Sequence, residues 1–311
     1  MKIRNLVLSI AIGMYLGLAG NVFAGPFDEE ETVKVEVKIP ENTLDLIDRL
    51  HKATTVDEYK LNVRFVPKDQ RDGLLVDGVR LAKSVDEVIA LARDTSGESR
   101  RIILREGAKV GKTAQDFIKL ADYAYRYGDG MLEFSGVNDE ILLTGAEKVT
   151  SVTEILTLAK KSKGDTDHEK ILLSGAGKAR TLSEFLELAF AARFPATLDR
   201  ILESGAEKLS SIAEIILLSQ RATTAKMRDH ILLTGATKVK NVSEIIDLAK
   251  ECSAVSDRLF NQDNHDEIIL LGAGRLPSLS SLDCDLLEAA SFKRKTMDSL
   301  RELASRRKVA G

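Results

Sequence analysis

One glycine-centred phrase recurs through this chain, and it constrains the fold more than any other feature. Residues 171–189 read ILLSGAGKARTLSEFLELA, and residues 231–249 read ILLTGATKVKNVSEIIDLA. The phrase contains no histidine or cysteine, so its repetition indicates packing rather than catalysis. When the chain is aligned on the glycine, seven copies are found: Gly78, Gly107, Gly145, Gly175, Gly205, Gly235 and Gly272. The four central copies, from Gly145 to Gly235, are 30 residues apart.

Each copy predicts a pair of helices. Six residues after the glycine stands a Ser, Thr or Asn, whose side-chain oxygen can accept from the free N–H groups of a first helical turn. In five copies a Glu follows three residues later, as in a capping box. Apolar residues then recur at helical spacing, and an apolar triplet such as 171–173 predicts another helix before the glycine. We expect the glycine to end that first helix in the left-handed conformation.

Helices this short are marginally stable alone and must pack on their neighbours. The sequence therefore predicts a mainly α fold, a right-handed α-solenoid of about seven ~30-residue helix–turn–helix repeats over residues 68–290. Aromatic residues make up only 5% of the chain, so we expect an aliphatic core.

The two-helix unit with its glycine exit resembles the repeats of bacterial α-solenoids of the HEAT-like kind, over about residues 68–290 and in architecture only. The loops SGAGK (174–178) and TGATK (234–238) are faintly similar to those of TAL-effector repeats, which place a Gly-Gly-Lys loop between two helices. These resemblances imply a fold and no particular activity.

The N-terminal 67 residues differ from the repeats. Residues 1–24 are typical of an export signal, with Lys2 and Arg4 before an apolar run and Ala24 before the expected cleavage point. An uncleaved membrane anchor is the alternative; we expect a periplasmic or secreted protein with no membrane span in the mature chain. Residues 32–39 and 59–66 alternate apolar and polar residues around a helical pattern that ends at Leu50, which predicts a small α/β cap, strand–helix–strand, over residues 25–67.

The last segment, residues 291–311, is basic and predicts a capping helix or tail, with a docking surface for an acidic partner or anionic lipid as the alternative. The chain has two cysteines, Cys252 and Cys284. In an exported protein they could form a disulfide, and otherwise they would be two buried thiols.

Two sets of residues are candidates for binding a partner. Three residues after the glycine stands a cation, and in a stack these cations would form one line: Lys148, Lys178, Lys208, Lys238 and Arg275. They could pair with the acidic residues six before the glycine in neighbouring units, or face an acidic or polyanionic partner. The second set lies in an insertion at 123–139 and either contacts a partner or fills an irregular repeat: Tyr123, Tyr125, Tyr127 and Phe134.

The sequence predicts no enzyme, no cofactor and no metal site. The GKT string at 111–113 lacks the spaced glycine and the preceding strand of a phosphate-binding loop. His168 and His265 share one repeat position, which predicts exposed surface residues rather than a convergent site. We predict an exported non-catalytic scaffold that binds a protein or peptide partner along a repeat surface. The alternative is a polyanion-binding module, for cell-wall polymer, lipopolysaccharide or nucleic acid, that uses the loop lysines; the net charge of −3 argues against nucleic acid.

Overall fold

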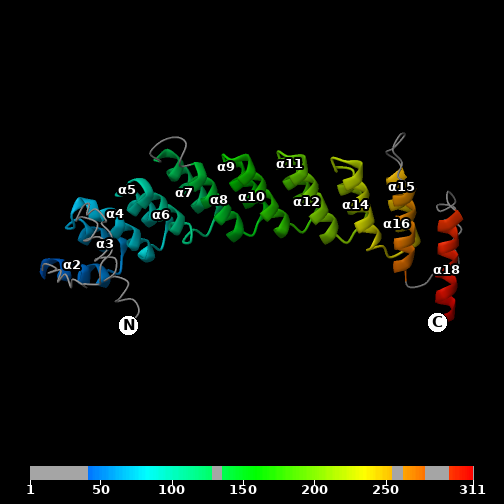
Figure 1. Cartoon of the computed structure of the whole chain (residues 1–311), viewed down its shortest axis with the longest axis horizontal. Helices are drawn as coiled ribbons and strands as arrows, with labels where there is room; N and C mark the ends of the chain where they lie inside the picture. Colours follow the sequence, from blue (N-terminus) through cyan, green and yellow to red (C-terminus); the bar gives the residue numbers. More distant parts are fainter. Residues whose placement is uncertain (1–40, 128–134, 254–261, 277–293, 311) are drawn as a thin grey trace, which may run out of the picture. The chain divides into compact units, whose positions relative to one another are not determined.

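The computed structural model describes residues 41–127, 135–253, 262–276 and 294–310, and this part of the chain is mainly helical (Figure 1). It holds sixteen α-helices and one 3-10 helix, and no strand is found within these ranges. The chain divides into residues 1–45 and 46–311. Of the first unit only the start of helix α2 is described, so the account below concerns the second. None of the described helices is long and apolar enough to cross a bilayer.

The repeats are pairs of helices, as predicted. The first helix of each pair carries the repeated glycine near its end: α6 (Gly97–Gly107), α8 (Ser135–Lys148), α10 (Asp165–Lys178), α12 (Pro195–Lys208), α14 (Ala225–Ala236) and α16 (Gln262–Arg275). The second helix follows the predicted cap: α5 (Val85–Arg93), α7 (Ala114–Arg126), α9 (Val152–Lys161), α11 (Leu182–Ala191), α13 (Ile212–Ser219) and α15 (Val242–Ser253). Before them lie α2 (Glu41–Lys52), α3 (Val56–Val63), α4 (Lys68–Asp77) and η1 (Gly78–Leu81), and after them α18 (Arg294–Ala310).

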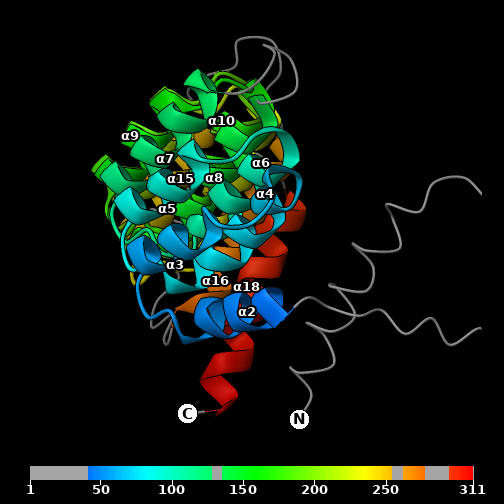
Figure 2. The same cartoon turned by 90° about the vertical axis from the view of Figure 1, so that its left-hand side faces the viewer.

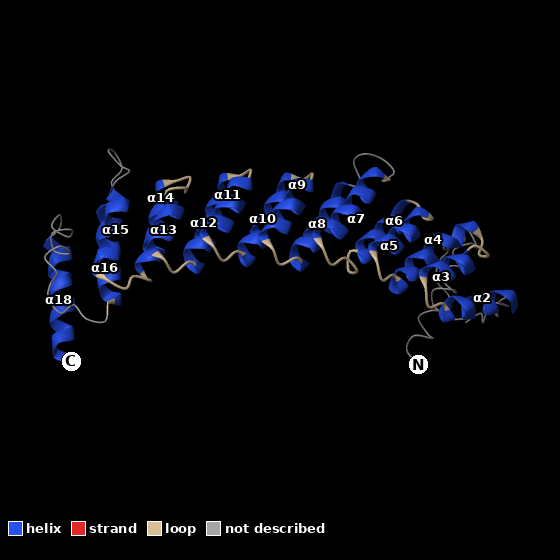
Figure 3. Ribbon diagram, turned by 180° about the vertical axis from the view of Figure 1, so that it is seen from behind, coloured by secondary structure: helices blue, strands red, loops and turns tan. Residues whose placement is uncertain are grey.

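From α3 to α16 each helix packs on the next helix and on the next but one. First helices contact first helices, as α8 contacts α10 and α10 contacts α12, and second helices contact second helices, as α9 contacts α11. The odd-numbered helices α5 to α15 and the even-numbered helices α6 to α16 therefore form two layers, which separate in the view along the stack (Figure 2). Figure 3 shows the loops at the two opposite edges of these layers.

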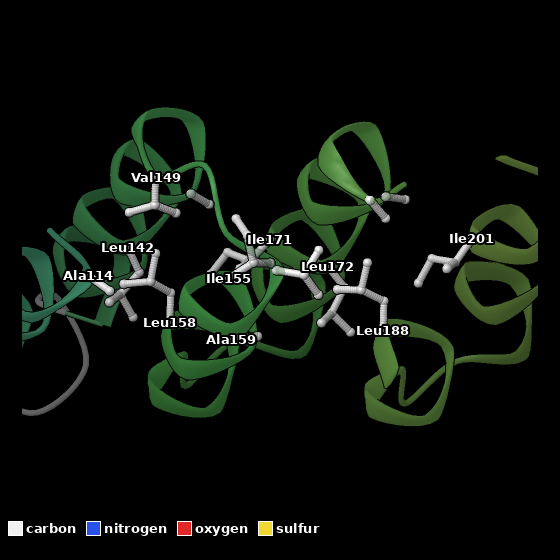
Figure 4. Close-up of a cluster of buried hydrophobic side chains, with 14 of the residues drawn as sticks. Ala114, Leu142, Val149, Ile155, Leu158, Ala159, Ile171, Leu172, Leu188 and Ile201 are labelled. Carbon is white, nitrogen blue, oxygen red and sulfur yellow. The ribbon is translucent and has the colours of Figure 1, made fainter. Parts of the chain in front are cut away.

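One continuous hydrophobic cluster joins the repeats, from Leu50 to Leu300. Around α8 to α12 it is built from fully buried Leu142, Ile155, Leu158 and Leu172, which follow one another between the helices (Figure 4). Among the largest fully buried side chains of the described residues, Phe117 and Phe185 are aromatic and the others are Leu or Ile, which agrees with the expected aliphatic core. The basic C-terminal segment forms α18, where Leu300 is buried and the helix packs on α16.

In the described part of the chain four of the predicted helix caps form and two do not. Ser84, Thr113 and Thr181 each make a full capping box with the acidic residue three positions later. Asn241 Oδ1 accepts from the N–H of Glu244 at 2.9 Å. Ser151 and Ser211 occupy the same position in extended conformation without a side-chain capping bond.

The strand predicted over 59–66 is wrong, because these residues belong to helix α3 and the turn after it. Thr55 caps this helix by accepting from the N–H of Glu58, and Val56, Tyr59 and Val63 recur at helical spacing on its buried face. Phe65, in the turn after this helix, is 71% exposed, whereas Val63 is buried. The helix predicted up to Leu50 is found as α2, whereas the strand at 32–39 and the export signal lie outside the described residues.

The predicted role of the glycine is also wrong. Among the described glycines only Gly97 has a positive φ, and Gly145 and Gly175 lie inside helices α8 and α10. A Cβ built on Gly145 would lie 2.6 Å from Phe117 Cγ, and one on Gly175 would lie 2.8 Å from Ile155 Cγ2. The glycine is therefore needed because neighbouring helices approach too closely for any side chain at that position.

Candidate functional site

The loop lysines are held by the preceding repeat. Lys208 Nζ donates to the carbonyls of Ala176 and Gly177 at 2.6 and 2.7 Å, and Lys238 Nζ donates to that of Ala206 at 2.7 Å. Lys178 makes the same contacts with the end of α8, and Lys148 with the carbonyls that follow α6. These oxygens stand at the C-terminal, partly negative end of the preceding first helix, so each ammonium caps that end. Arg275 is exposed at the end of α16.

Partial desolvation accompanies this capping. Withdrawal from water lowers the pKa of the Lys178, Lys208 and Lys238 ammonium groups, and nearby carboxylates such as Glu207 beside Lys238 offset part of that shift. The ammonium groups of these lysines are thus bound to backbone carbonyls of the preceding repeat, although Lys148 and Lys208 are exposed as residues.

The acidic residues six before the glycine do not pair with these lysines, as one alternative had expected. Asp199 accepts from the backbone N–H and the hydroxyl of Thr223 at 2.9 and 2.5 Å. Asp139 accepts from the backbone N–H groups of Lys163 and Gly164 at 3.0 and 2.9 Å. Each of these carboxylates is buried and ties its first helix to the loop that enters the next repeat. The lysine and the acid therefore act at opposite ends of the same helix, one toward the previous repeat and one toward the next.

A third periodic position is buried, as the acidic one is. His168 and His265 are 4% and 5% exposed, so the prediction of surface histidines is wrong. His168 bridges two second helices, with Nδ1 2.8 Å from the carbonyl oxygen of Ala159 and Nε2 3.0 Å from that of Ala191. Asn138, at the same repeat position, donates to the carbonyl of Ala121 at 2.9 Å. The periodic polar residues thus hydrogen-bond one repeat to another.

Exposed aromatic rings gather at the other edge, where the second helix of one repeat leads into the next repeat. Tyr125 and Tyr127 at the end of α7 are 57% and 54% exposed, and Phe190 and Phe194 around the end of α11 are 67% and 46% exposed. Tyr123, also predicted as a contact residue, is instead buried, with its ring centroid 4.7 Å from that of Tyr127. Phe134 lies outside the described residues.

Stacking does not require a ring at position 190. Phe190 stands fifteen residues after its glycine, and at that position the other described repeats carry polar residues: Arg93, Asp122, Lys160, Gln220 and Lys250. This departure from the repeat pattern is the sequence signal that could have found the residue. An exposed ring that packing does not need is a candidate contact for a partner.

Cations from the following repeat cover two of these rings. The Nζ atom of Lys163 lies 5.0 Å from the centroid of the Tyr125 ring, and Cζ of Arg221 lies 5.5 Å from that of Phe190. Arg193 is exposed nearby and pairs with Asp165. We call the following set the aromatic–basic edge: Tyr125, Tyr127, Lys160, Lys163, Phe190, Arg193, Phe194 and Arg221.

This edge and the lysine contacts lie at opposite ends of the first helices. Helix α8 has 14 residues, so its ends are ~20 Å apart. The aromatic–basic edge is formed by the ends of the second helices and the chain that leads to the next first helix, whereas the lysines stand at the C-terminal ends of the first helices. The two surfaces are separate.

Elsewhere in the described part of the chain we find one groove and one buried thiol. A groove of about 310 Å³ between α6 and α8 is crossed by the ion pair of Arg105 and Glu140 and is otherwise walled by Ala108, Ile141, Leu143, Thr144 and Glu147. Within the described ranges no three His, Cys, Asp or Glu side chains converge as metal ligands would. Cys252 is a buried thiol 3.7 Å from Asp229 Oδ1, while Cys284 lies outside the described residues, so their pairing stays a prediction.

Comparison with known proteins gave no relative: no protein-family model, curated protein or solved structure matches this chain. Its function must therefore be inferred from its own residues.

Proposed function

We propose that this chain is an exported, non-catalytic scaffold, a right-handed α-solenoid of about seven repeats, that binds a protein or peptide partner through its aromatic–basic edge. The observation that carries the proposal is the exposure of Phe190, at 67%, in a position that is polar in the other described repeats. Aromatic residues and Arg are enriched in the contact surfaces of proteins, and here Phe190 and Arg221 stand together.

The role as a scaffold follows from how the stack uses its polar residues. The repeated lysines, acids and the His168 position are engaged between repeats, and the described residues offer no nucleophile–base pair beside the edge. A rigid row of helices with exposed rings at one edge is suited to binding without chemistry. The export signal in residues 1–24 supports a periplasmic or secreted location.

The alternative, a polyanion-binding module built on the loop lysines, has less support. Its cations, Lys178, Lys208 and Lys238, have ammonium groups bound to backbone carbonyls. A polyanion would have to displace those bonds, which would weaken the contacts between repeats.

Site-specific photocrosslinking tests the proposal. A photoreactive phenylalanine analogue would be placed at Phe190 and, as the matched control, at Phe65, which is 71% exposed but lies outside the aromatic–basic edge. The full chain would be produced in its native cells and irradiated. We expect discrete protein adducts at position 190 and none at 65. Equal labelling at both positions, or adducts at neither, would refute binding through this edge.

A further inference from the structure

We infer that the aromatic–basic edge binds an extended acidic peptide segment that has an apolar side chain at each end and carboxylates between them. This inference rests on the proposed function, because it names the partner of the same surface. It follows from the order in which rings and cations stand along three successive second helices.

The edge alternates between rings and cations. Helix α7 ends with the exposed rings of Tyr125 and Tyr127, and α11 ends with those of Phe190 and Phe194. Between them the end of α9 and its loop expose cations and no large apolar side chain: Lys160, Lys161 and Lys163. A ligand lying across the three helices therefore meets the rings of α7, the cations of α9 and the rings of α11 in turn, with Arg193 and Arg221 beside the last rings.

The exposed cations of this edge outnumber the acids that pair with them. Lys160, Lys163 and Arg221 form no ion pair with a carboxylate in the described part of the chain. Lys161 pairs with Asp122 at 3.5 Å and Arg193 pairs with Asp165, and both pairs are solvent-exposed. Three of these five cations are thus unpaired with an acid, whereas the carboxylates of Asp139 and Glu169 beneath the edge are buried and accept from the backbone N–H groups of Lys163 and Arg193. The edge thus complements an acidic segment.

The cations are positioned for carboxylates. Lys163 and Arg221 are each held against a ring of the preceding repeat, which fixes them without neutralising them. The planar guanidinium of Arg221 can donate two parallel hydrogen bonds to one carboxylate. An apolar ligand side chain can then lie against Phe190 or Phe194, beside that carboxylate.

The spacing of the rings sets the length of the segment. Helices α7 and α11 belong to alternate repeats, and packed helix axes lie ~8–10 Å apart, so the two groups of rings are roughly 20 Å apart. An extended peptide advances about 3.3 Å per residue, so about six residues span that distance. The inferred ligand has apolar residues about six positions apart with Asp or Glu between them.

The test uses synthetic probes and the purified full chain. A fluorescent peptide with two leucines about six residues apart and glutamates between them would be titrated by fluorescence anisotropy. Control peptides have the same composition with the leucines adjacent, serines in place of the leucines, or lysines in place of the glutamates. We expect the spaced acidic peptide to bind at least about ten-fold more tightly than any of the three controls, a difference of about 1.4 kcal/mol.

Matched variants locate the contact. Phe190→Ser and Lys163→Glu should each weaken the spaced peptide about ten-fold. Phe65→Ser removes an equally exposed ring elsewhere, and Lys240→Glu reverses an exposed lysine beside the opposite ends of the helices, so neither should change the affinity. Unchanged thermal melts of all four variants would show that any loss is not caused by unfolding.

The outcomes separate this inference from the proposed function. If the peptide with adjacent leucines binds equally well, or if polyphosphate displaces the probe and all binding vanishes at moderate salt, the edge binds polyanions and the inference fails. If no acidic peptide binds while position 190 still crosslinks to a protein in cells, the inference fails and the proposed function stands. If crosslinking fails as well, both fail.

Discussion

Replacing Gly145 with alanine should destabilise the stack, because the new methyl group would meet the Phe117 side chain of the neighbouring helix. Its Cβ would lie 2.6 Å from Cγ, 2.8 Å from Cδ2 and 2.9 Å from Cβ of Phe117. Carbon atoms pack best at about 3.5–4.0 Å, so α7 and α8 must separate by about 1 Å. The atoms that collide form the root of a ring that is fully buried, so rotating the ring gives little relief.

Two opposing effects set the magnitude. Overpacking of a core typically costs about 1–3 kcal/mol, and this rigid contact belongs near the upper end of that range. Alanine in place of glycine inside a helix gains about 1 kcal/mol. We therefore expect Gly145→Ala to lose about 2 kcal/mol of stability.

Gly177 supplies the matched control. It lies near the end of α10, and no heavy atom comes within 4 Å of a Cβ built there. Gly177→Ala should gain about 0.5–1 kcal/mol because it only restricts the unfolded chain. At about 2–4 °C per kcal/mol, the thermal melts of the two variants, followed by circular dichroism, should differ on the order of 5–10 °C.

Asparagine at the same position distinguishes close packing from a left-handed helix exit. Asparagine tolerates the left-handed conformation, so an exit glycine would accept Gly145→Asn better than Gly145→Ala. Close packing predicts the reverse, since asparagine is larger. An asparagine variant as stable as the alanine variant, or an alanine variant that melts like Gly177→Ala, would refute the packing role.

Three further perturbations test the polar contacts between repeats and the buried thiol. Lys178→Met keeps the length of the side chain but removes a charged hydrogen-bond donor to the end of α8. Chemical denaturation should therefore show that the free energy of unfolding falls by about 1–3 kcal/mol. An unchanged denaturation midpoint would place the lysine in solvent. In Asp199→Asn the new amide either turns its own N–H toward the N–H of Thr223 or, in the other orientation, accepts from it more weakly than the carboxylate did. We therefore expect a loss of about 1–2 kcal/mol in the same assay. Wild-type stability would contradict the role of Asp199 in joining the two repeats. Burial, with Asp229 nearby, raises the pKa of the Cys252 thiol to about 12 from 9.0. In a Cys284→Ser variant this thiol should therefore react with a thiol reagent at pH 8 far more slowly in the native protein than after unfolding in urea, and the protein should unfold more easily as the pH rises from 9 toward 12. Reaction of the native protein at the unfolded rate would show that the thiol is accessible.

Local sequence was sufficient to predict most of the helices. The caps at Thr113 and Thr181 depend on side chains three residues apart, so no distant contact is needed to recognise them. The segment 59–66 failed for the complementary reason. Its alternation fits a strand, but the 3–4 spacing of Val56, Tyr59 and Val63 fits a helix equally well, and only burial against the neighbouring helices decides between them.

The roles of the repeated glycine and lysine depend on contacts with neighbouring helices and with backbone carbonyls, which cannot be recognised from the sequence. A left-handed exit and a close helix contact both exclude a Cβ, so the sequence at Gly145 is the same for either. The partners of Lys208 are the backbone carbonyls of Ala176 and Gly177, which every residue possesses. A side-chain pattern could therefore suggest acidic partners for the lysines while the available acceptors belonged to the main chain.

In a stack of repeats, the residues that recur in every repeat and the residues that bind a partner are expected to be different ones. A residue that recurs at one position in each repeat is maintained by the contact between repeats, as the lysine at 208 and the carboxylate at 199 are. A partner that is not itself periodic has to be recognised by residues that depart from the pattern and remain exposed. Phe190 meets both conditions, because its counterparts in the described repeats are polar and its ring is 67% exposed. Binding should therefore be sensitive to changes at the irregular positions and insensitive to the periodic ones, except where these unfold the stack.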